Sequence, residues 1–224
     1  MVRKLIKDVL LLPALLLAWS AWAVGFQYEE GTHYVKLDVA LKTRNTNSVE
    51  VTEYFSYGCP HCYRFEPLVQ QWKSDLPADV DFNRTPAIWN ITGYELYART
   101  YYTAEALGVL DKVHYPLFQA IHRDRRSLLD LKSMSIFMAE YGVEPGIFVK
   151  TFTESFGVKA MYQQAIARQR IYQSNGVPAV IVNGKYRVEA GMVGNNNADM
   201  LQVVDYLVAK ERQFISAGTE SGSP

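Results

Sequence analysis

The sequence has very little cysteine. Cys59 and Cys62 are the only two thiols among its 224 residues. Only two residues separate them, so a disulfide between them cannot tie distant segments of the chain together. A zinc site would need further ligands, and His33, His114 and His122 make no recognisable zinc pattern with the two cysteines. We therefore expect no metal and no other cofactor.

The sequence also has no excess of charge of either sign. Its 23 Lys and Arg residues are balanced by 23 Asp and Glu residues. A chain without a basic excess gives no reason to expect nucleic acid or an anionic membrane as a partner. We therefore expect no nucleic-acid partner.

A long apolar run is missing as well. The most apolar segment, residues 9–18, is shorter than the ~20 residues that a spanning helix needs. Three cationic residues precede it and the triplet 21–23 (Ala-Trp-Ala) follows it, which is the three-part pattern of a secretory signal peptide. We predict that residues 1–23 are cleaved after export, which leaves 201 residues with a net charge of −2 in a compartment where disulfides persist. An uncleaved membrane anchor is the alternative.

The first part of the mature chain predicts a strand–helix–strand unit. Ser48–Phe55 is rich in β-branched and aromatic residues, which is typical of a strand. A helical pattern follows from Pro60, a residue that suits the first turn of a helix. Val80–Thr85 is the second strand candidate. Together they form a βαβ unit.

The next 80 or so residues have a helical pattern throughout. Glycines follow the helical runs and a proline opens one of them, as helix ends prefer. Because so long a block exceeds a simple crossover, we interpret residues 92–174 as an inserted helical subdomain. The expected helices are Tyr94–Leu107, Leu110–His122, Leu128–Tyr141, a short one from Pro145 and a long one that ends near Ser174.

The chain then returns to strands. Ala179–Val182 and Lys185–Val188 are joined by Asn-Gly, the strongest short-range signal for a hairpin. A last helix is expected over Ala198–Phe214, and the Gly/Ser-rich residues 215–224 are expected to be disordered. The whole pattern predicts an α/β fold in which residues 24–91 and 175–214 form one domain around the helical insertion.

The two cysteines lie where a helix should begin. The i, i+3 spacing of Cys59 and Cys62 places both side chains on one face of the helix, close enough for a disulfide. Cys59 lies among unpaired backbone N–H groups at the positive end of the helix dipole, and a protonated His61 would add a second positive influence. Both favour a thiolate, which attacks disulfides and is also a good leaving group. One cysteine should be exposed at the helix tip and the other tucked beneath the first turn.

Two less reactive interpretations of this motif stay open. The disulfide could be purely structural, although so short a loop would stabilise the fold very little. His61 could be an ordinary surface histidine.

A second feature is Val177-Pro178, which follows Gly176 and precedes a strand. A proline in this position is often only a boundary marker. Before a strand that should pair in the central sheet, it could also form a cis peptide bond that exposes Val177 backbone groups beside the cysteines. The residues alone leave both interpretations open.

With the helical insertion between them, the stretches Glu53–Cys62 and Gly176–Lys185 resemble the DsbA family, thioredoxin-fold thiol:disulfide oxidoreductases of the bacterial periplasm. The resemblance extends from Tyr28 to about Phe214. Cytosolic thioredoxins have Gly-Pro between their cysteines, and dithiol isomerases carry an N-terminal dimerisation domain for which residues 24–48 are too short. The resemblance therefore implies a thioredoxin fold with an inserted helical subdomain and a monomeric oxidase.

The resemblance also implies roles for particular residues. Cys59 would be the substrate-linked sulfur, Cys62 its buried partner and His61 a stabiliser of the Cys59 thiolate. Pro178 would be cis, with Val177 in the substrate-binding loop.

Glu53 matches a buried acidic residue that relays protons near the second cysteine. The usual partner of this acid is a lysine on the next strand. Val80–Thr85 contains no lysine, so the resemblance leaves Glu53 without an identified cation.

The implied partners are reduced exported polypeptides as substrates and a DsbB-type, quinone-linked membrane protein as reoxidant. Two other functions remain as alternatives. A periplasmic reductase or isomerase would need a reduced resting state, and a chaperone-like peptide-binding module would keep its activity after both cysteines were replaced.

Overall fold

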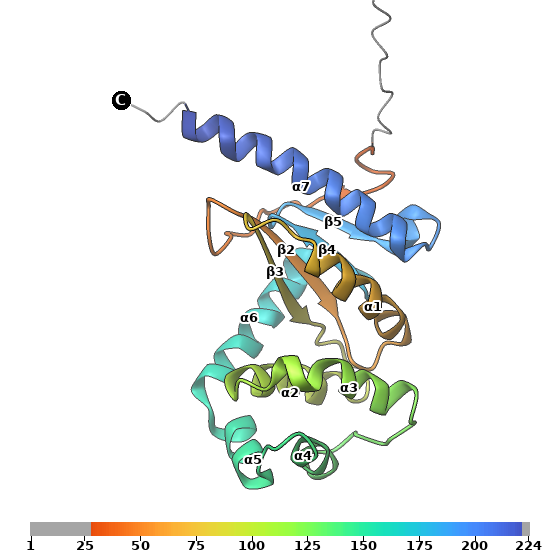
Figure 1. The fold of residues 1–224 in the computed structure, drawn as a ribbon, viewed down its shortest axis with the longest axis vertical. Coiled ribbons are helices and arrows are strands. Elements are labelled where there is room, and N and C mark those ends of the chain that lie inside the picture. The colour runs from red at the N-terminus through yellow and green to blue at the C-terminus, as the bar shows by residue number, and fades with distance from the viewer. Residues whose placement is uncertain (1–27, 221–224) are drawn as a thin grey trace, which may run out of the picture.

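A computed structural model describes residues 28–220, with side chains to Ser216. The expected signal peptide, residues 1–23, lies outside the described residues. A five-stranded sheet in the order β1-β5-β4-β2-β3 lies below the long helix α7 and above a group of helices (Figure 1). Its strands are β1 (Val35–Lys36), β2 (Val49–Phe55), β3 (Val80–Pro86), β4 (Ala179–Val182) and β5 (Tyr186–Glu189).

Strand β2 is the centre of the sheet, and all seven of its residues are buried. It pairs in parallel with β3 and antiparallel with β4, so both of its edges are satisfied. Helices α1 (Pro60–Ser74) and α7 (Asn197–Glu220) pack on the face that carries Val49 and Val51. The opposite face carries Tyr54, which packs against the end of α6. Because both faces are covered, the polar residues of β2 are buried with the apolar ones, and Glu53 is forced into the interior.

The chain leaves the sheet after β3 and returns at β4, with five helices in between. Their shared core is made of aromatic and aliphatic side chains such as Leu117, Phe118 and Phe137, and it reaches the cysteines. Gly108 and Gly142 have positive φ angles just after two of these helices, where an L side chain would be strained. The helices are α2 (Tyr94–Ala106), α3 (Leu110–His122), α4 (Leu131–Ala139), α5 (Pro145–Glu154) and α6 (Phe156–Tyr172).

The β4–β5 hairpin has the expected Asn-Gly turn. Asn183 and Gly184 both have positive φ angles, of 50° and 62°. A Cβ atom at Gly184 would lie 2.5 Å from the carbonyl oxygen of Leu41, so no larger residue fits this position without a backbone shift. The short strand β1 and a single 3-10 turn, η1 (Ala190–Val193), were not expected from the sequence.

The predicted end of the last helix was wrong. Helix α7 continues to Glu220 instead of ending at Phe214, so residues 215–220 are helical where we expected the start of a disordered tail. Helix α7 runs across the top of the molecule to its C-terminal end in Figure 1. Backbone hydrogen bonding along a helix already formed by its packed first turns continues into a stretch whose composition alone favours disorder.

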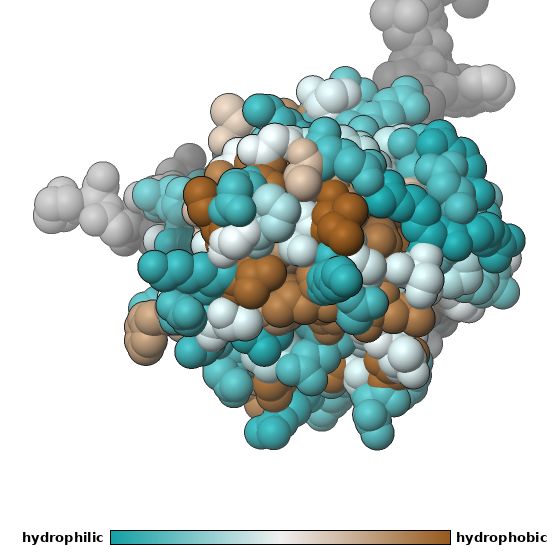
Figure 2. Space-filling model, turned by 90° about the horizontal axis from the view of Figure 1, so that it is seen from below, coloured by the Kyte–Doolittle hydropathy of each residue, from teal (hydrophilic) through white to brown (hydrophobic). Residues whose placement is uncertain are grey.

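The outer surface of the helical subdomain is mixed. Figure 2 views the molecule from below and shows apolar side chains broken up by polar ones. Within residues 28–220, no helix is long and apolar enough to cross a membrane. The exposed large apolar side chains of this subdomain are Leu129, Ile136, Ile147 and Phe156.

Candidate active site

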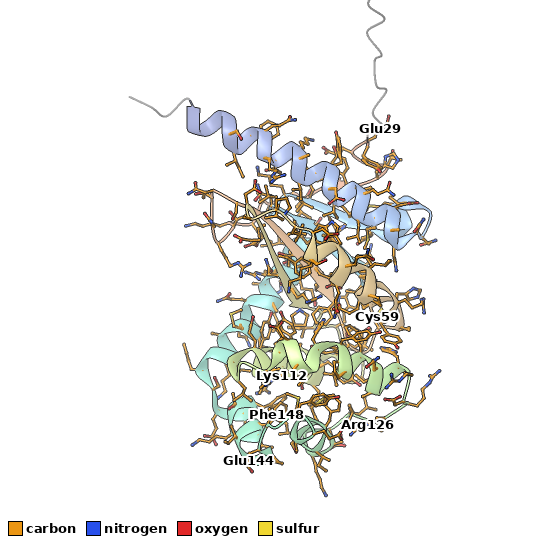
Figure 3. The ribbon with its side chains drawn as sticks, viewed as in Figure 1. Glu29, Cys59, Lys112, Arg126, Glu144 and Phe148 are labelled. Carbon is orange, nitrogen blue, oxygen red and sulfur yellow. The ribbon has the colours of Figure 1, made fainter. Side chains whose placement is uncertain are left out.

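The two cysteines lie where β2 turns into α1. Ser56–Gly58 form the turn, Cys59 is the N-cap residue of α1, and Pro60 opens the helix. Both thiols are free, so the structure shows the reduced protein. Figure 3 shows Cys59 at the junction between the sheet and the helical subdomain. This is the helix-start position that the spacing predicted.

Cys59 is less exposed than we expected for a cysteine at a helix tip. Its exposed fraction is 6%, against 0% for Cys62. The Cys59 thiol donates a hydrogen bond to the carbonyl oxygen of Val177 at 3.2 Å, so a loop 118 residues away covers the sulfur. Tyr94 packs against the residue before Cys59, because a Cβ atom added to Gly58 would lie 3.0 Å from the Tyr94 ring.

The two thiols have opposite acidities. The Cys59 pKa is lowered to about 6, and the largest cause is a hydrogen bond from the Cys62 side chain. Burial opposes this shift, while the backbone N–H groups of Cys62 and His61 and the charge of His61 add to it. Burial raises the pKa of Cys62 well above its ordinary value, and the bond to Cys59 raises it further. At neutral pH the pair therefore holds one thiolate, on Cys59.

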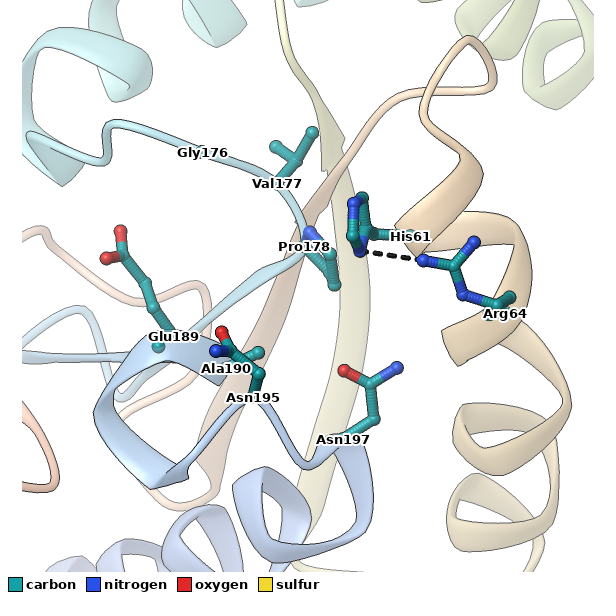
Figure 4. A pocket seen from close by; sticks show the side chains of 10 residues that line it. His61, Arg64, Gly176, Val177, Pro178, Glu189, Ala190, Asn195 and Asn197 are labelled. Carbon is teal, nitrogen blue, oxygen red and sulfur yellow. Dashed lines mark hydrogen bonds between the residues drawn. The ribbon is translucent and has the colours of Figure 1, made fainter.

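His61 is exposed on the first turn of α1. Arg64 Nη2 donates to His61 Nδ1 at 2.9 Å. Both side chains line a hollow of about 410 Å³ (Figure 4). A positive charge therefore reaches this part of the site through Arg64, which the sequence did not indicate.

The loop between α6 and β4 forms the facing wall of that hollow. Val177 and Pro178 line it together with Glu189, Asn195 and Asn197 (Figure 4). The peptide bond between Val177 and Pro178 is cis. The structure thus brings this loop and the cysteine motif together, as the resemblance implied.

Glu53 has a cationic partner, a question that the sequence left open. Arg84 lies opposite Glu53 in the β2–β3 register, and its Nε donates to Glu53 Oε2 at 2.7 Å. Arg84 Nη2 also donates to both oxygens of Glu66, at 3.0 and 3.1 Å. The next strand carries no lysine because an arginine does this work, and its planar fork bridges two buried carboxylates at once.

Burial raises the pKa of Glu53 to about 7, with Arg84 lowering it and Glu66 raising it. Burial acts on Glu66 in the same direction, but hydrogen bonding and charge from His114, together with Arg84, leave its pKa lowered. Glu53 is therefore the carboxyl that can change protonation near neutral pH. Its charge acts on the buried Cys62 thiol.

Sequence reasoning missed Arg84, Glu66 and His114. Glu66 could have been found, because it lies one helical turn after Cys62 on the side of α1 that carries buried Phe65. Arg84 could be found only from the register between β2 and β3, which places it opposite Glu53. His114 Nε2 lies 3.2 Å from Glu66 Oε2. His114 belongs to α3, inside the helical insertion, so its distance along the chain from Glu66 concealed this contact. A hollow of about 350 Å³ lined by all three opens this buried cluster to solvent.

Among residues 28–216, no group of three or more metal-binding side chains gathers in one place.

Comparison with known proteins gives consistent matches. Residues 77–204 match the family model of the DSBA-like thioredoxin domain. A thiol:disulfide interchange protein DsbA from Azotobacter vinelandii is 40% identical over 215 residues, which cover 91% of this chain and 97% of the relative. The protein of the same name from Pseudomonas aeruginosa is 39% identical over 214 residues, 94% of this chain and 97% of the relative. The crystal structure of Pseudomonas aeruginosa DsbA has a TM-score of 0.78 at 38% identity and matches 84% of this chain and 97% of that one.

Proposed function

This chain belongs to the DsbA-like family of thioredoxin-fold thiol:disulfide oxidoreductases, and from that premise we propose that its oxidised form donates the Cys59–Cys62 disulfide to reduced exported polypeptides. The observation that carries the proposal is the opposite acidity of the two thiols. A thiol that ionises easily leaves easily, so the protein releases a substrate bound to Cys59 readily.

The reaction begins when a substrate thiolate attacks the Cys59 sulfur. The Cys59–Cys62 bond breaks, and Cys62 leaves with the electron pair. Because the Cys62 pKa is high, this sulfur takes up a proton. Glu53, whose pKa is near 7, supplies that proton and regains one through the solvent-filled hollow beside Glu66.

A second substrate thiolate then attacks the substrate sulfur of the mixed disulfide. Cys59 leaves as a thiolate, the substrate keeps the new disulfide, and the protein is left reduced. The polar backbone of Val177 faces Cys59 at this stage and suits contact with an extended substrate chain. The hydrogen bond from Cys62 and the backbone N–H groups of Cys62 and His61 stabilise the departing thiolate.

The remaining parts of the proposal concern where the protein works and with whom. We propose that it acts as a monomer in the periplasm after removal of residues 1–23. A DsbB-type membrane protein linked to quinone would reoxidise the thiols. Membership of the family supports a substrate protein and a reoxidant in general.

The test is the equilibrium between this protein and glutathione, followed by the fraction of reduced Cys59. An oxidase should have a potential less negative than about −200 mV, the value typical of glutaredoxins. A potential near the roughly −270 mV of thioredoxin would indicate a reductase instead. Replacing both Cys59 and Cys62 with alanine tests the other alternative, a chaperone-like peptide-binding module, because such a module would keep its activity.

A further inference from the structure

The active-site face carries two arginines that have no acidic partner. Arg64 and Arg125 are both exposed, and neither forms an ion pair within residues 28–216. We define these two residues as the basic rim. The neighbouring arginines differ, since Arg123 binds Asp124 and Arg126 binds Glu140 through both nitrogens of their forks.

The charges of both arginines of the basic rim act on His122. Burial lowers the pKa of this histidine and its bond to the Tyr57 carbonyl opposes the shift, while the charges of Arg125 and Arg64 lower it further. Tyr63, the residue after Cys62, stacks on the His122 ring at 5.2 Å. The rim therefore borders the same turn of α1 that holds the cysteines.

Each arginine is held in place from the backbone or from a neighbour. Arg64 is fixed by its bond to His61 at 2.9 Å. Arg125 has a φ angle of 56° just after α3, a position where helix ends usually have glycine. The N–H of Arg126 donates to the carbonyl of Ala120 at 2.9 Å and closes this turn. An arginine costs stability at this left-handed position.

The local acids do not cancel the rim. Asp124 and Glu140 are occupied as described, and Glu189, on the opposite wall of the hollow, accepts from Ser174 at 2.5 Å and pairs with Arg187 at 3.2 Å. Figure 3 shows Arg126 on the α3–α4 segment, on the same side of the molecule as Cys59. A substrate that approaches Cys59 from this side therefore meets net positive charge.

We propose that the basic rim selects cysteine-containing segments with acidic residues next to the cysteine. This rests on the proposed function, because it concerns which reduced substrates reach Cys59 fastest. Unpaired surface arginines raise the rate at which anionic partners arrive and slow the arrival of cationic ones. The attacking group is itself an anion, a thiolate, so the rim favours it as well.

The test uses three dithiol peptides of equal length in which the residues beside the cysteines are aspartate, serine or lysine. The measured quantity is the second-order rate constant for reduction of the oxidised protein. At low ionic strength the acidic peptide should react about tenfold faster than the basic one, at the lower end of electrostatic steering. In about 1 M salt, where the Debye length is about 3 Å, the ratio should approach one.

Arg64→Gln and Arg125→Gln should each reduce the acidic-to-basic ratio about threefold, and Arg64→Lys should restore most of it. The ratio is the informative quantity because a change in the acidity of Cys59 would alter all three rates alike. Lys150→Gln on exposed α5 removes the same charge far from the site and should leave the ratio unchanged.

Equal rates for the three peptides would overturn the inference and leave the proposed function standing. An unchanged acidic-to-basic ratio in both arginine variants would do the same. If the protein oxidised none of the peptides, the serine peptide included, the proposed function would fail and the inference with it. A lower acidic-to-basic ratio in Lys150→Gln would also overturn the inference, because the effect would then come from the net charge of the protein and not from the two arginines.

Discussion

The stability of the reduced protein relative to the oxidised protein should rise with pH, because only the reduced form contains the Cys59 thiolate. The folded pKa is about 6, whereas an unfolded cysteine ionises near 8.5. A lowered pKa stabilises the fold fully above the unfolded value and not at all below the folded value. The change falls between about pH 6 and pH 8.5.

The size of the change follows from that difference in pKa. It corresponds to about 3 kcal/mol, with no reduction for screening because Cys59 is only 6% exposed. In the oxidised form the disulfide closes a loop of about four residues, which is worth ~2 kcal/mol at any pH. The oxidised protein should therefore be the more stable form by about 2 kcal/mol below pH 6, and the reduced protein should be the more stable form by about 1 kcal/mol near pH 8.5.

A second group titrates in the same range and must be separated. The raised pKa of Glu53, about 7, destabilises the fold as pH rises. Glu53 is present in both forms, so its contribution largely cancels when the two free energies of unfolding are subtracted.

The assay is urea unfolding of both forms at about pH 5.5, 7 and 8.5, with the free energies compared at each pH. Reduced Cys59→Ala is the control, because it should lack the pH dependence assigned to the thiolate. A difference between the two forms that stayed constant within about 0.5 kcal/mol across this range would refute the reasoning. Cys59 would then not be a stabilised thiolate.

Three substitutions test the site further. Cys62→Ala should accumulate mixed disulfides through Cys59, since Cys62 can no longer attack the mixed disulfide and release the substrate; mass spectrometry of non-reduced samples would show them, and their absence would reverse the roles of the two cysteines. Glu53→Gln should fold normally but exchange disulfides more slowly near pH 7, measured as rates between about pH 5 and 8; a profile identical to the wild type would remove Glu53 from the mechanism. Arg84→Met should cost about 3–5 kcal/mol in urea unfolding, because it leaves two buried carboxylates unpaired, and Arg84→Lys should recover part of this; a loss below about 1 kcal/mol would contradict the bridging role.

Much of the fold follows from local patterns in the sequence. The β-branched run before the cysteines forms β2, and α3 spans Leu110–His122 as its periodicity predicted. The Asn-Gly pair forms the β4–β5 turn. These elements are specified by residues that are neighbours in sequence, so a single chain without relatives is enough to recognise them.

The features that the sequence did not show depend on contacts between distant segments. Arg84 bridges Glu53 and Glu66 only because Val49 pairs with Val80, and a shift of one residue would turn it to the other face. The low exposure of Cys59 likewise depends on a carbonyl that arrives from residue 177. Local composition specifies neither the register between β2 and β3 nor the position of the loop that carries Val177.

The pairing of β2 has a consequence for how the protein folds. One edge of this strand is covered early by β3, about 30 residues later in the chain, but its other edge must wait for β4, which begins at residue 179. Contacts of such large sequence separation form late and slow the folding of a domain. Because synthesis starts at the N-terminus, both cysteines are made early. They stay uncovered until the helical insertion and β4 have been made. Until the last fifth of the chain is available, β2 keeps one open strand edge, and such an edge favours aggregation.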